Sequence, residues 1–125
     1  MKRPTSKKKR VQHKWIGNAS LHSRQKMVHS TLSSELKKKY GRNSLQVRKG
    51  DMVKVMRGGF SGVSGQVTGV SLKDSKVYIQ GVTIKKTDGT DVERPIHPSN
   101  LMIIELFEDD KRRRAILNRN VKEAE

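Results

Sequence analysis

Positive charge is concentrated in the first part of this 125-residue chain. Residues 1–50 hold 15 Lys or Arg and one acidic residue, a net charge of +14. Residues 51–106 (7 basic, 6 acidic) and 107–125 (6 basic, 5 acidic) carry a net charge of +1 each. Apolar residues follow the opposite distribution, with 13 among the first 50 residues and 21 among the next 56. The sequence therefore predicts a basic arm (residues 1–45), a nearly neutral globular domain (46–106) and a short charged tail.

Charge of this density also constrains the partner. A segment with so many cations and so few apolar residues cannot bury a core of its own, and it repels itself unless a polyanion neutralises it. Nucleic acid is the polyanion that such an arm most often meets. The sequence therefore favours a nucleic-acid-binding protein over a protein with a uniformly solubilising surface.

The arm contains one clear local signal. Residues 1–26 follow neither a helical nor a strand period, so we predict that they are irregular, and disordered in the free protein. A short helix is predicted at about residues 33–40, because Ser33 or Ser34 can cap its start and Gly41 can end it. Three apolar residues at four-residue spacing give this helix a face that can dock on an apolar surface: Leu32, Leu36 and Tyr40.

Short Val- and Ile-rich runs punctuated by glycine follow from Leu45, a pattern typical of β-strands. The Asp88-Gly89 pair predicts a tight hairpin, and Gly69 predicts a bulge or a sharp bend inside a strand. We expect a mainly β fold that closes into a small barrel, followed by a helical tail (107–125) with Asp109 and Asp110 in its first turn. The predicted strands are Met52–Met56, Gln66–Leu72, Lys76–Val82, Thr83–Thr87, Asp91–Pro95 and Leu101–Leu106.

A glycine-rich loop separates the first two predicted strands. It holds Gly58, Gly59, Gly62 and Gly65. Glycines at this density permit positive φ angles and leave backbone N–H groups uncovered, so the loop can approach a phosphate or a base closely. Spacing alone is also compatible with a plain glycine-rich turn that binds nothing, and taken by itself it favours that simpler interpretation.

The stretch from Gly50 to Val67 (GDMVKVMRGGFSGVSGQV) resembles the KOW motif, the strand–loop–strand unit of small SH3-like barrels in ribosomal and transcription elongation proteins. The usual motif has Lys or Arg before the glycine that corresponds to Gly62. Ser61 stands at that position here, and Arg57 is the cation nearest to it in sequence.

The segments flanking this motif narrow the resemblance. The sequences LSSELKKKY (32–40), VRKGD (47–51) and IHPSNL (96–101) are similar to matching segments of the universal large-subunit ribosomal protein number 24 family, in its archaeal and eukaryotic form. The resemblance extends from about Ser6 to Leu117, and a basic arm ahead of a KOW barrel is typical of that branch.

This resemblance implies a structural, non-enzymatic protein without a cofactor. Such proteins bind large-subunit ribosomal RNA near its 5′ region, take part early in subunit assembly and lie beside the exit of the nascent-peptide tunnel. Their partners are this RNA and neighbouring large-subunit ribosomal proteins. The fold that it implies is an SH3-like barrel with a basic N-terminal arm containing a short helix, and with a C-terminal helix.

Candidate RNA contacts combine the cations of the arm with the glycine loop. Lys and Arg at irregular spacing suit recognition of the phosphate backbone rather than of base sequence. The candidates before the domain are Lys2, Arg3, Lys7, Lys8, Lys9, Arg10, Lys14, Trp15, Arg24, Lys26, Lys37, Lys38, Arg42, Arg48 and Lys49. Those within the domain are Arg57, Gly58, Gly59, Phe60, Ser61, Gly62 and His97.

Several of these residues have two open interpretations. Trp15 could stack on an unpaired base or fill a hydrophobic notch on the barrel, and Phe60 could stack on a base or plug the barrel. His97 suits either a turn or a polar contact with RNA. Lys37–Lys39 occupy successive helical positions, so only one or two of these lysines can face one partner.

Other chemistries find no support in the sequence. The chain has no cysteine, and no pair of its four histidines has the four-residue spacing of a helical zinc site, so we expect no metal. No nucleophile elbow, phosphate-binding Walker loop or cluster of carboxylates is present, so we expect no catalytic residue and no small-molecule substrate. No apolar run approaches the roughly 18 residues that a membrane span needs, and residues 1–10 lack the apolar stretch of a secretory signal. We expect a cytoplasmic location.

Two other classes of protein fit the sequence less well. A KOW-type transcription or RNA-chaperone module would need a folded domain ahead of the barrel, and the arm is too basic and too poor in apolar residues to form one. A small enzyme acting on nucleic acid would need the carboxylate cluster or metal site that the sequence lacks.

Overall fold

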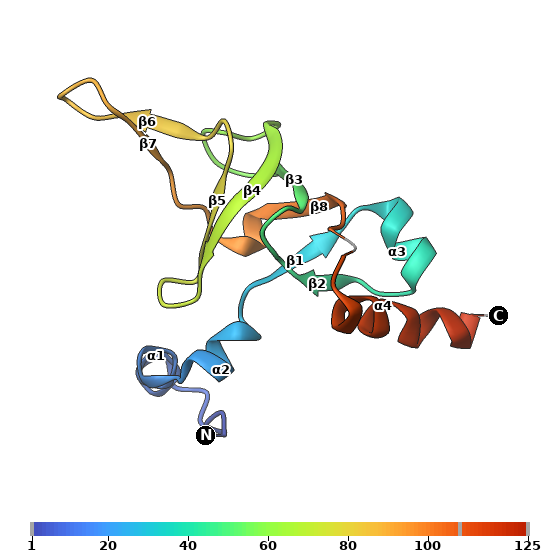
Figure 1. Ribbon diagram of the computed structural model, residues 1–125. Coiled ribbons are helices and arrows are strands. Elements are labelled where there is room, and N and C mark those ends of the chain that lie inside the picture. Colours follow the sequence, from blue (N-terminus) through green and yellow to red (C-terminus); the bar gives the residue numbers. More distant parts are fainter. Residues whose placement is uncertain (1, 108, 125) are drawn as a thin grey trace.

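The computed structural model describes residues 2–107 and 109–124, with only the helical backbone for residues 120–124. These residues form a mixed α/β fold in which a sheet supplies most of the core (Figure 1). The helices are α1 (Lys9–Asn18), α2 (Leu21–Gln25), α3 (Ser34–Tyr40), the 3-10 helix η1 (Pro98–Asn100) and α4 (Lys111–Ala124). The strands are β1 (His29–Leu32), β2 (Ser44–Gln46), β3 (Met52–Val55), β4 (Ser64–Ser71), β5 (Lys76–Ile79), β6 (Thr83–Lys85), β7 (Asp91–Glu93) and β8 (Leu101–Glu105).

The main sheet has six strands in the order β2-β1-β8-β3-β4-β5. All neighbouring pairs run antiparallel except β1 and β8, which are parallel with Thr31 opposite Met102. The register shifts between Val67 and Gly69, which agrees with the bulge or sharp bend predicted at this glycine. Beyond the outer edge of β5 a single bridge joins Val77 to Ile96.

The prediction of a closed barrel is wrong. The two edge strands, β2 and β5, do not pair with each other in the described residues, so the sheet stays open. The segments Thr83–Thr87 and Asp91–Pro95 do form the predicted hairpin, but it leaves the sheet as a separate two-stranded unit that projects from the body (Figure 1). Every residue of β6 and β7 is exposed. These strands contain one apolar residue each, Ile84 and Val92, and this is too little apolar surface to close a barrel around the core.

Alternate residues of the sheet strands form much of the core. Val53 and Val55 of β3 are fully buried, and so are Leu101 and Ile103 of β8, although the run 101–106 is largely apolar. This alternation follows from the period of two of a pleated strand. Further core residues come from segments far apart in the sequence: Val28, Leu32, Tyr40, Leu45, Val47, Val67, Val77, Ile79, Val82, Ile96 and Leu117.

Part of the predicted basic arm belongs to this sheet. Strands β1 and β2 were not predicted, yet β1 lies between β2 and β8, and Val28 and Leu32 are buried in the core. The proposed boundary between residues 45 and 46 falls inside β2. Sequence periodicity overlooks these strands because they are only 4 and 3 residues long and contain a single buried apolar residue each.

The prediction of an irregular segment over residues 1–26 is also wrong, because α1 and α2 occupy most of its second half. Helix α1 has no buried residue, and only Val11, Gln12 and Trp15 are half-buried, so it shows little of the apolar period that signals a helix. The Gln12 side chain donates hydrogen bonds to the carbonyl oxygens of Pro4 (3.2 Å) and Ser6 (2.8 Å). The preceding segment is thereby folded back along α1.

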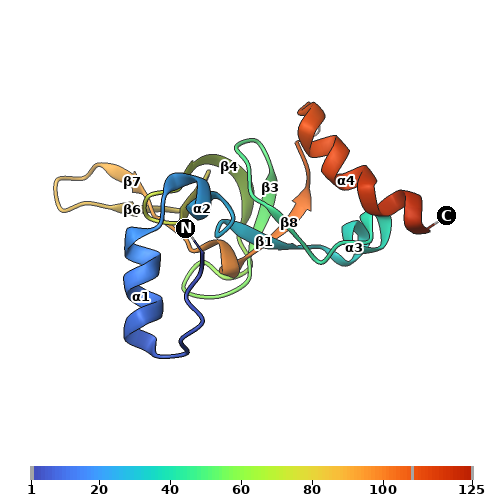
Figure 2. The same cartoon turned by 90° about the horizontal axis from the view of Figure 1, so that it is seen from below.

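The predicted helix at residues 33–40 is confirmed as α3. Ser33 is at its N-cap position, although its hydroxyl makes no capping hydrogen bond, and Gly41 ends it with a φ of 63°. Figures 1 and 2 both place α3 beside α4 at one end of the molecule, with α1 and α2 at the other end. The fold therefore splits the charge-rich first 50 residues between two separate regions.

Among the glycines of the sheet, Gly65 lies closest to neighbouring backbone. A Cβ atom at this position would lie 2.5 Å from the Gln80 carbonyl oxygen, whereas one at Gly69 would have no neighbour within 4 Å. We expect the Gly65→Ala substitution to lower the free energy of unfolding by about 1–3 kcal/mol, because a fixed carbonyl must move. Gly69→Ala, the matched control in the same strand, is expected to leave it unchanged or slightly raised. Equal effects of the two substitutions in denaturant unfolding would contradict this assignment.

Candidate nucleic-acid interface

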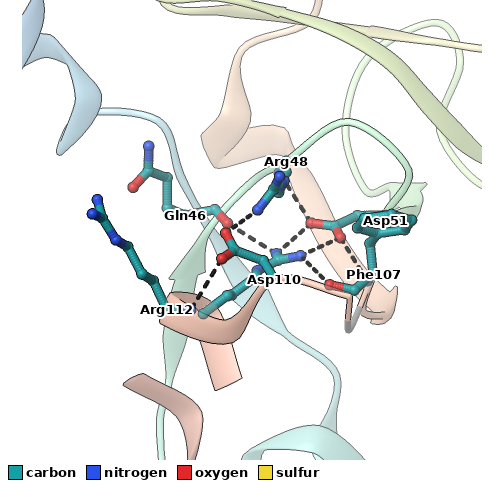
Figure 3. Close-up of polar contacts among 7 residues, drawn as sticks. Gln46, Arg48, Asp51, Phe107, Asp110 and Arg112 are labelled. Carbon is teal, nitrogen blue, oxygen red and sulfur yellow. Dashed lines mark hydrogen bonds and ion pairs between the residues drawn. The ribbon is translucent and has the colours of Figure 1, made fainter. Parts of the chain in front are cut away.

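A buried carboxylate anchors the C-terminal helix to the sheet (Figure 3). Asp51 precedes β3 and is fully buried, and Arg113 of α4 is 6% exposed. Both terminal nitrogens of the Arg113 guanidinium donate to the two carboxylate oxygens of Asp51. The carboxylate also accepts backbone N–H groups of Phe107 (2.9 Å) and Arg48 (3.0 Å). We call these residues, with Gln46, the Asp51 node.

Arg113 forms hydrogen bonds beyond those to the Asp51 carboxylate. Arg113 donates further to the carbonyl oxygens of Gln46 (3.1 Å) and Phe107 (3.2 Å), so one side chain of α4 joins β2, the turn before β3 and the segment after β8. Next to this pair, Arg48 forms an ion pair with Asp110 (Figure 3). The Arg48 guanidinium also lies over the Phe107 ring, with its carbon atom 5.8 Å from the ring centre. Arg48, a predicted RNA contact, therefore already has an acidic partner.

The predicted contacts among residues 1–26 lie on helices α1 and α2 and in the segments that flank them. Lys2, Arg3 and Lys26 are exposed, and so are the four basic residues from Lys7 to Arg10 together with Lys14. Arg24 differs from these, because its guanidinium donates to the carbonyl oxygens of Ala19 (3.0 Å), Gly17 (2.9 Å), Ile16 and Lys73. Arg24 thus joins the end of α1 to the β4–β5 turn, and its side chain holds these two segments together.

Trp15 lies within the arm. It lines a groove of about 360 Å³ together with Arg3, Ile16 and Met27, and its indole nitrogen is buried without a hydrogen-bond partner among the described residues. Trp15 is not among the core residues of the sheet. The sequence left open whether Trp15 stacks on a base or fills a notch on the barrel. Its position in the arm does not support the second interpretation.

The α3–α4 end carries a second group of cations. Lys37, Lys38 and Lys39 are exposed on α3, and Arg42 donates to the Ile116 carbonyl oxygen of α4 (3.4 Å). Helix α4 adds four exposed cations: Lys111, Arg112, Arg114 and Arg119. They were not predicted as contacts, because the tail as a whole is nearly neutral. The run KRRR at 111–114 is the signal that could have indicated them.

The glycine loop between β3 and β4 has the predicted backbone. Gly58 and Gly62 have φ angles of 93° and 90°. The Ser61 hydroxyl donates to the Met56 carbonyl oxygen at 3.1 Å, so it is used within the loop. Phe60 is half-buried against the core, and the Arg94 guanidinium carbon lies 5.6 Å from the centre of its ring. This arrangement favours the packing role for Phe60 over base stacking.

A groove of about 170 Å³ beside this loop brings in residues from other elements. Lys76 from the start of β5 and Arg94 from the end of the hairpin line it together with Arg57 and His97. Sequence reasoning missed Lys76 and Arg94, because nothing local in the sequence connects either residue with the glycine loop.

His97 is held in one orientation by η1. Its Nδ1 accepts the backbone N–H of Ser99 (3.2 Å) and lies 2.7 Å from the Ser99 hydroxyl. Burial and then the charge of Lys76 lower the pKa of His97 below its ordinary value of 6.5. Burial and then the charge of Arg42 do the same for the pKa of His29. Both shifts favour the neutral form of the imidazole in the folded protein.

Neither a metal cluster nor a membrane span is found in the described part of the chain. Within residues 2–107 and 109–124, no three His, Cys, Asp or Glu side chains are grouped so as to hold a metal ion. Over that same part of the chain, no helix combines the length and the apolar character needed to cross a membrane.

The comparison with known proteins identifies the family. Residues 6–120 match a family of ribosomal proteins, described as L26 in eukaryotes and as its L24-type equivalent in archaea. The chain belongs to this ribosomal protein family. One relative is the large ribosomal subunit protein uL24 of Methanothrix thermoacetophila, which is 51% identical over 114 residues, covering 91% of this chain and 98% of the relative. The family resemblance found in the sequence, from about Ser6 to Leu117, is thereby confirmed.

Membership of this ribosomal protein family gives the two charged ends a common interpretation. Family members are named as ribosomal proteins, and recognition of folded RNA in general depends largely on phosphate and shape. Exposed lysines without acidic partners are the side chains suited to that task. Arg48 and Arg24, which are engaged within the protein, are less suited to it than Lys7–Lys9 or Lys37.

The Asp51 node yields a prediction about stability. Replacing Arg113 by Met leaves a buried carboxylate without its cation, and we expect the free energy of unfolding to fall by about 3–5 kcal/mol. Arg112→Met in the adjacent, exposed position is the matched control and should change it by less than about 0.5 kcal/mol. Denaturant unfolding measures both. Similar losses in the two variants would show that the node does not anchor α4.

The capping role of His97 predicts a dependence on pH. Because its folded pKa is lowered, the unfolded chain binds the proton more tightly. The stability that neutral His97 contributes is present above pH 6.5 and is lost as the pH falls through its folded pKa. His97→Asn keeps a capping acceptor that does not titrate, so unfolding free energies measured from about pH 8 to about pH 5 should fall less in this variant. Parallel curves for the two proteins would contradict the assignment.

Proposed function

We propose that this protein is a structural constituent of the large ribosomal subunit in the cytoplasm, where it binds large-subunit ribosomal RNA. The observation that carries this proposal is the 51% identity, over nearly the whole of both chains, to a protein named as a large-subunit component. The net charge of +16 and the exposed cations of α1, α3 and α4 support it.

The finer parts of the proposal come from the family resemblance. We place the binding site on the RNA near its 5′ region and the protein beside the exit of the nascent-peptide tunnel, with a role in early subunit assembly. Neighbouring ribosomal proteins are its other partners. The β3–loop–β4 unit is the proposed KOW motif of an SH3-like domain, and residues 1–45, 46–106 and 107–125 are proposed as RNA-binding arm, KOW domain and helical tail.

The proposed mechanism is charge neutralisation combined with shape, without catalysis, cofactor or small-molecule substrate. Lys and Arg of the arm neutralise phosphates of RNA helices that would otherwise repel each other. The open sheet serves as a rigid support that holds the two cationic ends at a fixed separation. Each end can then contact a different part of the folded RNA.

The salt dependence of RNA binding tests the role of the arm. The variant Lys7→Gln, Lys8→Gln, Lys9→Gln, Lys14→Gln removes four exposed lysines from α1 and its approach. The matched control Lys54→Gln, Lys73→Gln, Lys85→Gln, Lys86→Gln removes four exposed lysines from the sheet and hairpin. Affinity for a 5′-region fragment of large-subunit RNA is measured between about 50 and 200 mM salt.

We expect the arm variant to flatten the plot of log affinity against log salt by about 0.7–0.9 for each phosphate interaction that the substitutions remove, and the control to flatten it much less. Equal flattening in both variants would show that affinity follows net charge rather than the arm. Failure of the unaltered protein to bind the fragment would overturn the proposed function itself.

A further inference from the structure

The glycine loop presents four backbone donors without acceptors. The N–H groups of residues 57–60 donate no hydrogen bond within the described chain, whereas the next three residues donate theirs to carbonyl oxygens of the same strand–loop unit. An added Cβ at Gly58 or Gly59 would meet nothing within 4 Å, so the backbone here is open to a ligand. Successive uncovered N–H groups next to a glycine at positive φ form the kind of concavity that binds anions.

Three side-chain cations line the groove beside these donors. They come from three different elements: Arg57 from the loop, Lys76 from β5 and Arg94 from the segment after β7. None of the three forms an ion pair with a carboxylate in the described residues. Mutual repulsion among three cations that line one groove is relieved by a bound anion, so the groove is electrostatically suited to an anion.

Two further observations indicate how the groove is organised. The position of Arg94 is set by its backbone, which donates to the Val82 carbonyl oxygen (3.0 Å), and by its stacking on Phe60. The hydrogen bond that His97 Nδ1 accepts from Ser99 leaves the ring proton on Nε2, so this imidazole is a donor as well. At about 170 Å³, the groove is smaller than the roughly 300–1,000 Å³ that encloses a drug-sized molecule.

We propose that this groove binds a single phosphate group of the RNA backbone, held by the N–H groups of residues 57–60 and by the side chains of Arg57, Lys76 and Arg94. The inference rests on the proposed function, and it adds to it the ligand group and two residues that the sequence did not indicate. Ser61 occupies the place where a KOW motif usually has a cation, and its hydroxyl is used inside the loop. Lys76 and Arg94 supply the charge from outside the motif.

NMR titration of the ¹⁵N-labelled full chain tests the site directly. The probes are a short RNA duplex, inorganic phosphate and uridine, which has no phosphate, all at constant ionic strength. We expect saturable shifts of the Gly58–Phe60 amide signals with RNA and with phosphate, and none with uridine. Shifts with uridine but not with phosphate would overturn the inference, because the groove would then recognise a base.

A pair of variants separates this site from the rest of the interface. In Lys76→Gln/Arg94→Gln the signals of the loop amides should no longer shift with phosphate. The slope of log RNA affinity against log salt should flatten by the amount expected for the loss of about one phosphate contact. The control Lys85→Gln/Lys86→Gln removes the same charge from the neighbouring hairpin and should leave the amide shifts intact.

The two proposals fail in different ways. If RNA shifts the arm amides but leaves the loop amides unmoved, the groove proposal is wrong while the proposed function stands. If the unaltered chain shows no RNA-induced shift at all, the proposed function is wrong, and with it the assignment of the phosphate to RNA, whatever inorganic phosphate does.

Discussion

The buried pair of Asp51 and Arg113 is the interaction on which the arrangement of this protein depends. A carboxylate at 0% exposure would be very costly without a cation, and this cation comes from a helix 62 residues further along the chain. Because the guanidinium also bonds to carbonyl oxygens of β2 and of the segment after β8, it fixes α4 against the edge of the sheet that the N-terminal segment builds. The buried Asp51–Arg113 pair thus determines where the exposed cations of α4 lie.

Two cationic ends follow from this arrangement. Helix α4, once anchored, lies beside α3 and adds its exposed cations to the lysines there, while α1 and α2 carry theirs at the other end of the molecule (Figures 1 and 2). Arg24 holds the first pair of helices to the β4–β5 turn by bonding to the Lys73 carbonyl oxygen. A protein with cations at both ends of an open sheet is suited to bridging separate parts of a folded RNA.

Local signals in the sequence predicted local features well. The Asp88-Gly89 hairpin, the bulge at Gly69 and the short helix ended by Gly41 each depend on turn chemistry or four-residue spacing, which are read directly from neighbouring residues. Helix α1 was not predicted because it buries no residue and shows little of an apolar period. The closed barrel was inferred from the number of strands, and the exposed hairpin shows why a count cannot decide closure.

The sequence by itself determined that the charge belongs to the first 50 residues, that a glycine loop joins two strands, and which family the chain resembles. These properties are carried by composition and by neighbouring residues. Only the tertiary structure decided that β1 and β2 enter the sheet, that Arg24 and Arg48 have internal partners, and that Lys76 and Arg94 meet the glycine loop. The physical reason is that most of these contacts join residues tens of positions apart, and their geometry is set by the packing of the whole sheet.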